Sequence, residues 1–273
     1  MTSTSIGPHL PRLAHSGRVT QLNVIRSEWT KLRSVRSTLW SLFCAVVFTI
    51  GIAGIATAVI SHHWPQVSPG DRADFHPLEP TLGGVQLAQL AIGVLGVLVI
   101  SGEYSTGMIR ASMSAAPKRL PVLWGKAVVY GLTTLVLMVP SAFAAFFVGQ
   151  AILSGRHIEA GIGDPGVARA VLGAGLYLTV VGLFGLGLGA IVRNTAGGIA
   201  LFAGIMFVLP PLMNVLPSSW NNAASPYLPL QAGERILQTT GGTLSPWTGF
   251  GIFCAYAAAA LAIAAWLLKK RDV

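Results

Sequence analysis

The sequence predicts an all-α polytopic membrane protein with six transmembrane helices. Only 10% of its 273 residues are charged and 53% are hydrophobic, whereas a water-soluble domain carries about a quarter charged residues. The apolar residues gather into six long runs, and Lys and Arg cluster at the ends of those runs. Together the spans use most of the chain, so we expect no sizeable soluble domain.

The net charge of +9 would indicate nucleic-acid binding in a soluble protein. Here the basic residues flank apolar runs, where they set topology and contact anionic headgroups. We therefore expect a lipid bilayer as the surrounding medium and no nucleic acid as a partner.

Residues 1–20 carry Gly, Pro, Ser and Thr without an apolar period, which predicts a disordered basic tail. Residues 21–38 change pattern and predict an amphipathic interfacial helix along the inner headgroups. Its apolar residues at near-helical spacing are Leu22, Ile25, Trp29, Leu32 and Leu39. Its basic residues, on the other face, are Arg26, Lys31, Arg33 and Arg36.

The first span is expected at 39–60, long enough to cross roughly 30 Å of hydrocarbon at about 1.5 Å per residue. A cleaved signal peptide would have a hydrophobic region of only about 7–15 residues, so we expect retention. The following loop, 61–81, contains His62, His63, His76, Asp71, Asp74 and Glu79. Their spacing matches no tight metal-ligand pattern, which favours a solvated loop over a metal site.

The second span is expected at 82–100 and the third at 122–148, with a kink in the third at Pro140. Gln86 and Gln89 lie at i and i+3 on the second span. They could line a cargo path or bond to a neighbouring helix, and the structural role is the favoured one because buried amides commonly bond across helices.

The fourth span, 167–192, carries Gly182, Gly185 and Gly189 on one face, which predicts close packing against another helix. Arg193 and Asn194 form a short inner turn before the fifth span, 195–216. Pro210 and Pro211 should bend the outer end of the fifth span, and Asn214 near that end is a further candidate for a substrate path or helix contact.

Residues 217–246 are polar enough to lie outside the membrane but contain an amphipathic piece around Glu234 and Arg235. A half-inserted helical hairpin or a surface helix would fit this pattern. The sixth span is expected at 247–268, followed by a basic cytoplasmic tail at 269–273.

The segment from Ser101 to Lys126 separates the second and third spans and is both basic and amphipathic. Ile109, Met113 and Ala116 fall at i, i+4 and i+7, so a short helix would present one apolar stripe, which Pro117 would end. The basic residues around the stripe are Arg110, Lys118, Arg119 and Lys126, against the single acid Glu103. The segment is either a docking surface for a soluble partner or a plain basic connector.

The orientation follows from the distribution of the 18 Lys and Arg residues. Only Arg72, Arg156, Arg169 and Arg235 fall on one side of the predicted spans. The positive-inside rule then places both termini and the 101–126 segment in the cytoplasm.

The sequence lacks the residues that several activities require. No predicted span carries an ionisable side chain deep in its apolar run, which argues against an ion-coupled carrier. The nearest match to a phosphate loop, Gly102 to Gly107, continues with Met108 and Ile109 in place of the required Lys and hydroxyl. We expect no ATPase site, no metal site and no catalytic residues, and therefore no enzyme.

Two segments carry a resemblance to a known family. They are VIRSEWTKLRSVRSTLW (24–40) and GEYSTGMIRASMSAAPKRLPVLWGKAV (102–128). Together with the six spans they resemble the permease subunits of ABC-2 type exporters, particularly actinobacterial ones.

The resemblance implies an N-terminal elbow helix, a cytoplasmic coupling helix that docks on a separate ATPase, and re-entrant outer helices between spans five and six. The implied elbow-helix residues are Trp29, Lys31, Leu32, Arg33 and Arg36. The implied coupling-helix residues are Glu103, Gly107, Met108, Ile109, Arg110, Met113, Pro117 and Lys118.

The expected function is therefore that of a permease subunit in the plasma membrane, exporting a hydrophobic or amphipathic drug, antibiotic or lipid by alternating access. The expected partners are cytoplasmic ABC ATPase subunits, which would bind ATP and Mg, and a second permease copy or paralogue. The alternative is a non-transporting membrane anchor or immunity factor that holds a cytoplasmic partner. An adjacent gene for an ATPase with a phosphate loop would favour the exporter.

Overall fold

The computed structural model describes residues 21–105, 120–215 and 217–270. The predictions made for the two terminal tails and for the stripe around Ile109 and Met113 lie outside the described residues. Within those ranges every regular element is a helix.

Six of the described helical segments are long and apolar enough to cross a membrane, as the apolar runs predict. The expectation of an all-α chain with six such helices is confirmed. The segments contain α2 (Arg36–His63), α5 (Val85–Ser105), α7 (Leu120–Leu153), α8 (Val167–Val192), α9 (Thr195–Ala203) with its continuation, and α13 (Pro246–Lys270).

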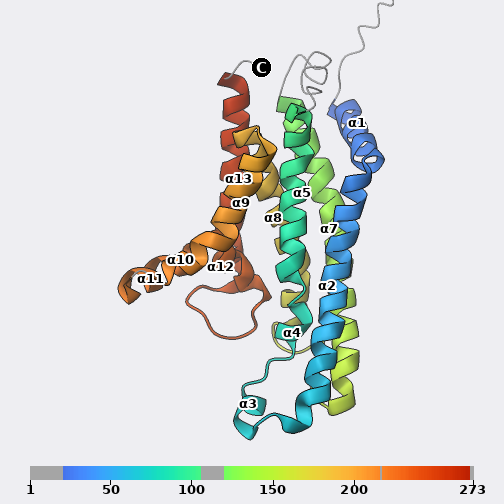
Figure 1. Ribbon diagram of the computed structural model, residues 1–273, viewed down its shortest axis with the longest axis vertical. Helices are drawn as coiled ribbons and strands as arrows, with labels where there is room; N and C mark the ends of the chain where they lie inside the picture. Colours follow the sequence, from blue (N-terminus) through green and yellow to red (C-terminus); the bar gives the residue numbers. More distant parts are fainter. Residues whose placement is uncertain (1–20, 106–119, 216, 271–273) are drawn as a thin grey trace, which may run out of the picture.

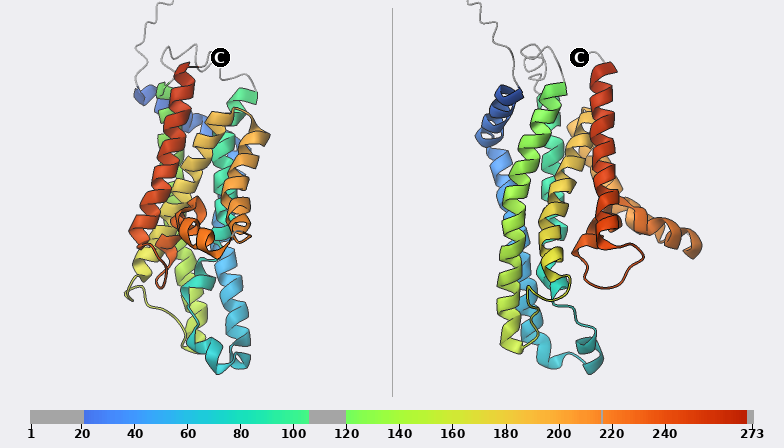
Figure 2. Two further views of the ribbon diagram at one scale, coloured as in Figure 1. Left: turned by 90° about the vertical axis from the view of Figure 1, so that its left-hand side faces the viewer. Right: turned by 180° about the vertical axis from the view of Figure 1, so that it is seen from behind.

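Helix α8 lies at the centre of the bundle, between α5, α7 and α13, and α2 packs on α5 and α7 (Figures 1 and 2). Small residues allow α8 to approach α5 closely. A Cβ built on Gly185 would lie 2.2 Å from the carbonyl oxygen of Gly93, and one on Gly96 would lie 2.2 Å from that of Gly182. A Cβ built on Gly189 would lie 2.9 Å from the carbonyl oxygen of Val97. The glycine face of α8 therefore lies against α5.

Helix α1 (Gln21–Ser34) precedes α2 and packs mainly on α7. Val35, with extended backbone, separates the two helices. The buried residues of α1 are Val24, Glu28 and Leu32, at i, i+4 and i+8. Trp29, on the predicted apolar stripe, is 49% exposed. The face that meets the bundle thus has a carboxylate at its middle.

Helix α7 continues through Pro140 in a single helix to Leu153. The turn between α8 and α9 is as short as the sequence indicates: Arg193 has φ 58°, and the side chain of Asn194 accepts a hydrogen bond from Gly197 N at 2.9 Å. This cap and left-handed residue reverse the chain within two residues.

The fifth apolar segment leaves the bundle. After α9 comes a π-helical turn, η3 (Gly204–Val208), and then α10 (Leu209–Met213), which has Pro210 and Pro211 in its first turn. Together with α11 (Ser218–Ala224) it projects sideways from the bundle (Figure 1). The chain returns through η4 (Ser225–Tyr227), α12 (Pro229–Glu234) and η5 (Arg235–Leu237) to pack on α8 and α13.

The remaining short elements lie at the end of the bundle away from α1 (Figure 1). They are η1 (Trp64–Gln66), α3 (Pro69–Ala73), α4 (Leu78–Leu82) and η2 (Ser154–Arg156).

The described basic residues divide unequally between the two ends. Helix α1, the starts of α2 and α7, the turn after α8 and the C-terminus of α13 lie towards one end (Figure 1). These elements carry Arg26, Lys31, Arg33, Arg36, Lys126, Arg193, Lys269 and Lys270. Helix α3, η2, the start of α8 and η5 lie towards the other end (Figure 1) and carry Arg72, Arg156, Arg169 and Arg235.

Candidate functional site

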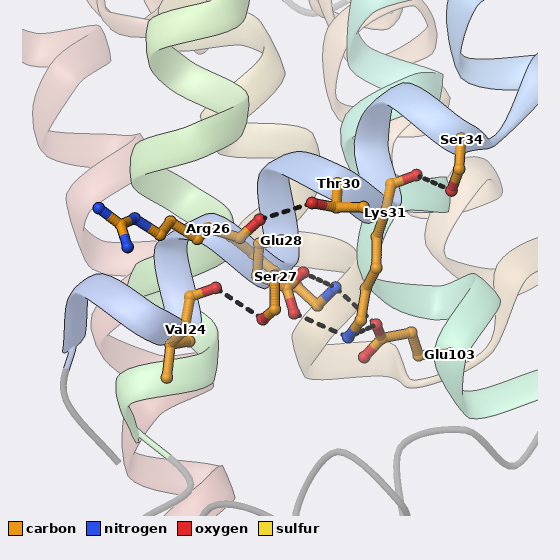
Figure 3. A network of polar contacts seen from close by, with 9 residues as sticks. Val24, Arg26, Ser27, Glu28, Thr30, Lys31, Ser34 and Glu103 are labelled. Atoms are coloured by element: carbon orange, nitrogen blue, oxygen red, sulfur yellow. Dashed lines mark hydrogen bonds and ion pairs between the residues drawn. The ribbon is translucent and has the colours of Figure 1, made fainter. Parts of the chain in front are cut away.

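Two carboxylates and two ammonium groups form a closed ring at the basic end of the bundle. Lys31 Nζ lies 2.8 Å from Glu28 Oε1 and 2.9 Å from Glu103 Oε1. Lys126 Nζ lies 2.6 Å from Glu28 Oε2 and 2.8 Å from Glu103 Oε1. Each ion therefore has two neighbours of opposite charge. We call Glu28, Lys31, Glu103 and Lys126 the charge ring; Figure 3 shows Lys31 reaching from α1 to Glu103.

Three helices supply the ring. Glu28 and Lys31 come from α1, Glu103 from the last turn of α5, and Lys126 from the second turn of α7. Gly125 lets α1 approach α7 at this point, because a Cβ there would lie 2.9 Å from Val24 Cγ1. The ring thus ties the helix before the first span to the ends of both helices that flank residues 106–119.

The ring is largely removed from water. The side chain of Lys126 is only 3% exposed, and those of Glu28 and Glu103 are 5% and 9% exposed, while Lys31 is 34% exposed. Burial of Lys31 disfavours its charged form, but its hydrogen bonds to Glu28 and Glu103 outweigh this and raise the pKa of Lys31. Removing one partner from such a buried set leaves an uncompensated charge, which is strongly destabilising.

An apolar pocket of about 380 Å³ adjoins the ring. Leu95, Leu98 and Val99 of α5 line it, together with Val35 at the junction of α1 and α2. Glu103 Oε2 is buried and has no hydrogen-bond partner among the described residues.

The structure brings together some of the residues singled out from the sequence and separates others. Lys31 and Glu103 are both in the ring, and Leu32 is buried one residue along α1. Trp29, Arg33 and Arg36 are exposed and take no part in it. The other residues assigned to the coupling helix lie outside the described residues; they are Gly107, Met108, Ile109, Arg110, Met113, Pro117 and Lys118.

The sequence analysis assigned no role to Glu28, and it counted Lys126 among the basic residues of the segment between the second and third spans. A signal was available: Lys126 falls inside the apolar helix that begins at Leu120, and a charge there requires a counter-ion. Glu28 lies three residues before Lys31, on the same helical face. Only the fold could identify Glu28 as the partner of Lys126.

A second polar group lies at the other end of α5. Tyr177 of α8 donates a hydrogen bond to Gln89 Oε1, Gln89 Nε2 donates to Gln86 Oε1 at 2.8 Å, and Gln86 Nε2 donates to Glu234 Oε1 at 2.7 Å. Asn214 is separate from this chain, and its Oδ1 accepts a hydrogen bond from Asn221 Nδ2 at 3.3 Å.

Within the described ranges, no three His, Cys, Asp or Glu side chains lie close enough to hold a metal ion. Comparison with known proteins finds no matching family model and no matching curated protein.

Proposed function

We propose that this chain is the permease subunit of an ATP-driven ABC-2 type exporter, which moves a hydrophobic or amphipathic substrate outward by alternating access. The proposal rests on the resemblance of residues 24–40 and 102–128 to that family and on six apolar helices. The single observation that carries it is the charge ring. A permease driven by a separate ATPase needs a stiff connection between the docking surface and the spans, and the ring has the required geometry.

The ring joins α1 to the end of α5 and the start of α7. These two helices flank residues 106–119, in which the sequence predicts the coupling helix. A push on that helix or on α1 would therefore displace α2, α5 and α7 together, because a buried ion-pair network resists separation of its members. We propose that Glu28 and Lys126 transmit this displacement and that Ile109 and Met113 receive it.

The partners in this proposal are cytoplasmic ATPase subunits, which bind ATP and Mg, and a second permease copy or paralogue. The projecting arm of α10 and α11 supports the second copy. Leu212 of α10 and Trp220 of α11 are 58% and 69% exposed, and apolar side chains so placed are suited to another helical surface in the bilayer or to lipid.

The unequal division of basic residues supports a plasma-membrane orientation with α1 and the end of α13 on the cytoplasmic side. In this orientation α1 is the elbow helix, with Trp29 and Leu22 exposed towards the inner headgroups. The segment from η4 to η5 then takes the place of the re-entrant outer helices.

The experiment that tests the function is purification of the tagged full-length chain from host membranes in mild detergent. A protein with a phosphate loop should co-purify in a fixed ratio, and the reconstituted pair should hydrolyse ATP faster when cargo is present. Recovery of a partner without a phosphate loop would instead support the membrane anchor.

A further inference from the structure

A pocket of about 520 Å³ opens at the end of the bundle away from the charge ring. One wall comes from α4 and the start of α5, including Leu82 and Val85, and the other from α12, η5 and the residues that follow, including Leu237. Its volume is within the range that holds drug-sized ligands. The carboxylate of Glu234 and the amide of Gln86 lie together in its lining.

The carboxylate of Glu234 accepts a hydrogen bond from Gln86, the last amide in a hydrogen-bonded series. Tyr177 donates to Gln89, Gln89 to Gln86, and Gln86 to Glu234 Oε1, so each amide turns its NH₂ group towards the carboxylate. Tyr177 and Gln89 are fully buried. Such a series of hydrogen bonds is mutually polarising and favours a negative charge at its end.

That negative charge has no fixed counter-ion. Within the described ranges Glu234 makes no ion pair. Arg235, the next residue, donates to the carbonyl of Leu244 at 3.2 Å and also to Gln238 Oε1 and Gly241 O. Arg169 donates to the carbonyl of Gln238 at 3.0 Å. Both guanidinium groups are thus engaged with neutral acceptors.

We infer that this pocket binds an organic cation, an amine or onium group on an apolar body, with Glu234 as its counter-ion. The apolar wall residues fit the body of such a ligand, and the carboxylate of Glu234, which makes no ion pair with the described residues, fits its charge. A metal ion would need more ligands than the described residues assemble there. The inference rests on the proposed function only in identifying this ligand with the exported cargo.

Ligand binding should depend on pH. Burial raises the pKa of Glu234 to about 7, although the hydrogen bond from Gln86 opposes the shift. The ionised form is the one that attracts a cation, so affinity should rise as pH increases. The other titratable or charged groups facing Glu234 are Tyr177 from α8, Arg235 from η5 with Arg169 beside it, and Glu79 and His76 across the pocket.

The test uses the purified chain alone, in nanodiscs of zwitterionic lipid, with tetraphenylphosphonium as the probe and tetraphenylborate as an anion of the same shape. Equilibrium binding of the phosphonium should be saturable and should strengthen by about tenfold between about pH 6 and about pH 8. Glu234→Gln keeps the hydrogen-bonding shape but removes the charge. It should weaken binding by about tenfold or more at the higher pH and abolish the pH dependence.

Two variants of the pocket lining separate Glu234 from its titratable neighbours: Glu79→Gln and His76→Gln should both retain the pH dependence. Glu159→Gln, which removes an exposed carboxylate outside the lining, is the matched control and should leave both the affinity and its pH dependence unchanged. Parental binding by Glu234→Gln, equal saturable binding of tetraphenylborate, or loss of the pH dependence in His76→Gln would overturn the inference. The binding test uses no ATPase, so a negative result there does not contradict the exporter proposal. Likewise, failure to co-purify an ATPase does not contradict the cation site.

Discussion

The ammonium group of Lys126 lies 2.6 Å from Glu28 Oε2, although 98 residues separate them in the chain. This contact joins α1, which precedes the first of the six segments long and apolar enough to cross a membrane, to the third of them. It is the closest pair in the charge ring, and both side chains are almost completely buried.

Lys126→Met should destabilise the protein, because Glu28 and Glu103 would then share only Lys31. Loss of one member of a buried ionic set costs about 3–5 kcal/mol, so the thermal unfolding midpoint in detergent should fall. Lys269→Met, at the exposed end of α13, is the control and should leave the midpoint unchanged. Equal midpoints for Lys126→Met and the parent would show that the ring contributes nothing to stability.

Charge exchange should distinguish a ring from a set of independent pairs. The double variant Glu103→Lys, Lys126→Glu places a lysine at position 103 beside Lys31 and a glutamate at position 126 beside Glu28. Because like charges then meet at both contacts, this variant should be less stable than the parent. Exchanging all four residues restores the alternation and should recover part of the lost stability. If the double variant alone recovers, the contact between Glu103 and Lys126 acts as an isolated pair.

Gly185→Ala should destabilise the bundle by about 1–3 kcal/mol, because the added methyl group would meet the carbonyl oxygen of Gly93 and separate α8 from α5. Gly251→Ala is the matched control on α13, where a Cβ would meet nothing within 4 Å. That change should be neutral or stabilising by about 0.5–1 kcal/mol. In the same thermal unfolding assay Gly185→Ala should therefore lower the midpoint while Gly251→Ala leaves it unchanged or raises it, and Gly185→Leu should lower it more than Gly185→Ala.

Replacing Ile109 and Met113 with Ser should lower affinity for the ATPase by about 100-fold or more, at about 1.5–3 kcal/mol per buried apolar side chain. Membrane insertion should be normal, since the spans are unchanged. Lys118→Glu is the comparison and should do less, because flanking charges mainly set orientation and rate. Full recovery of the ATPase by the double variant would make α1 the better candidate for the docking surface.

The proposed orientation can be checked by labelling. In a background with Cys44→Ala and Cys254→Ala, Ser68→Cys should react with an impermeant thiol reagent on intact cells, because Ser68 lies at the exposed start of α3. Ser114→Cys should react only after permeabilisation. The reverse pattern would invert the topology derived from the basic residues.

The sequence was sufficient for features that depend on neighbouring residues. The apolar runs predict the long helices because hydropathy accumulates locally, and the period of Gly182, Gly185 and Gly189 predicts the face of α8 that packs closely. The two roles predicted for Gln86, lining a cargo path or bonding to a neighbouring helix, also came from the local pattern. The structure supports a contact with a neighbouring helix through Glu234 and also places Gln86 in a pocket lining.

Features that join distant segments could not be predicted in this way. Helical periodicity placed Glu28 beside basic residues of α1 but could not indicate that Lys126 would face it. The departure of α10 from the bundle was also missed, although Pro210 and Pro211 indicated a bend. A π-helical turn precedes that bend, and no residue pattern in Gly204–Val208 marked it.

The separation of 98 residues between Glu28 and Lys126 also constrains the order in which the ring can form during synthesis. Ribosomes add about 5–20 residues per second, so Lys126 is synthesised about 5–20 s after Glu28. Throughout that interval Lys31 is the one ring partner of Glu28 that has already been made. The charge ring can close only after Lys126 follows, and its closure is the step that joins α1 to both α5 and α7.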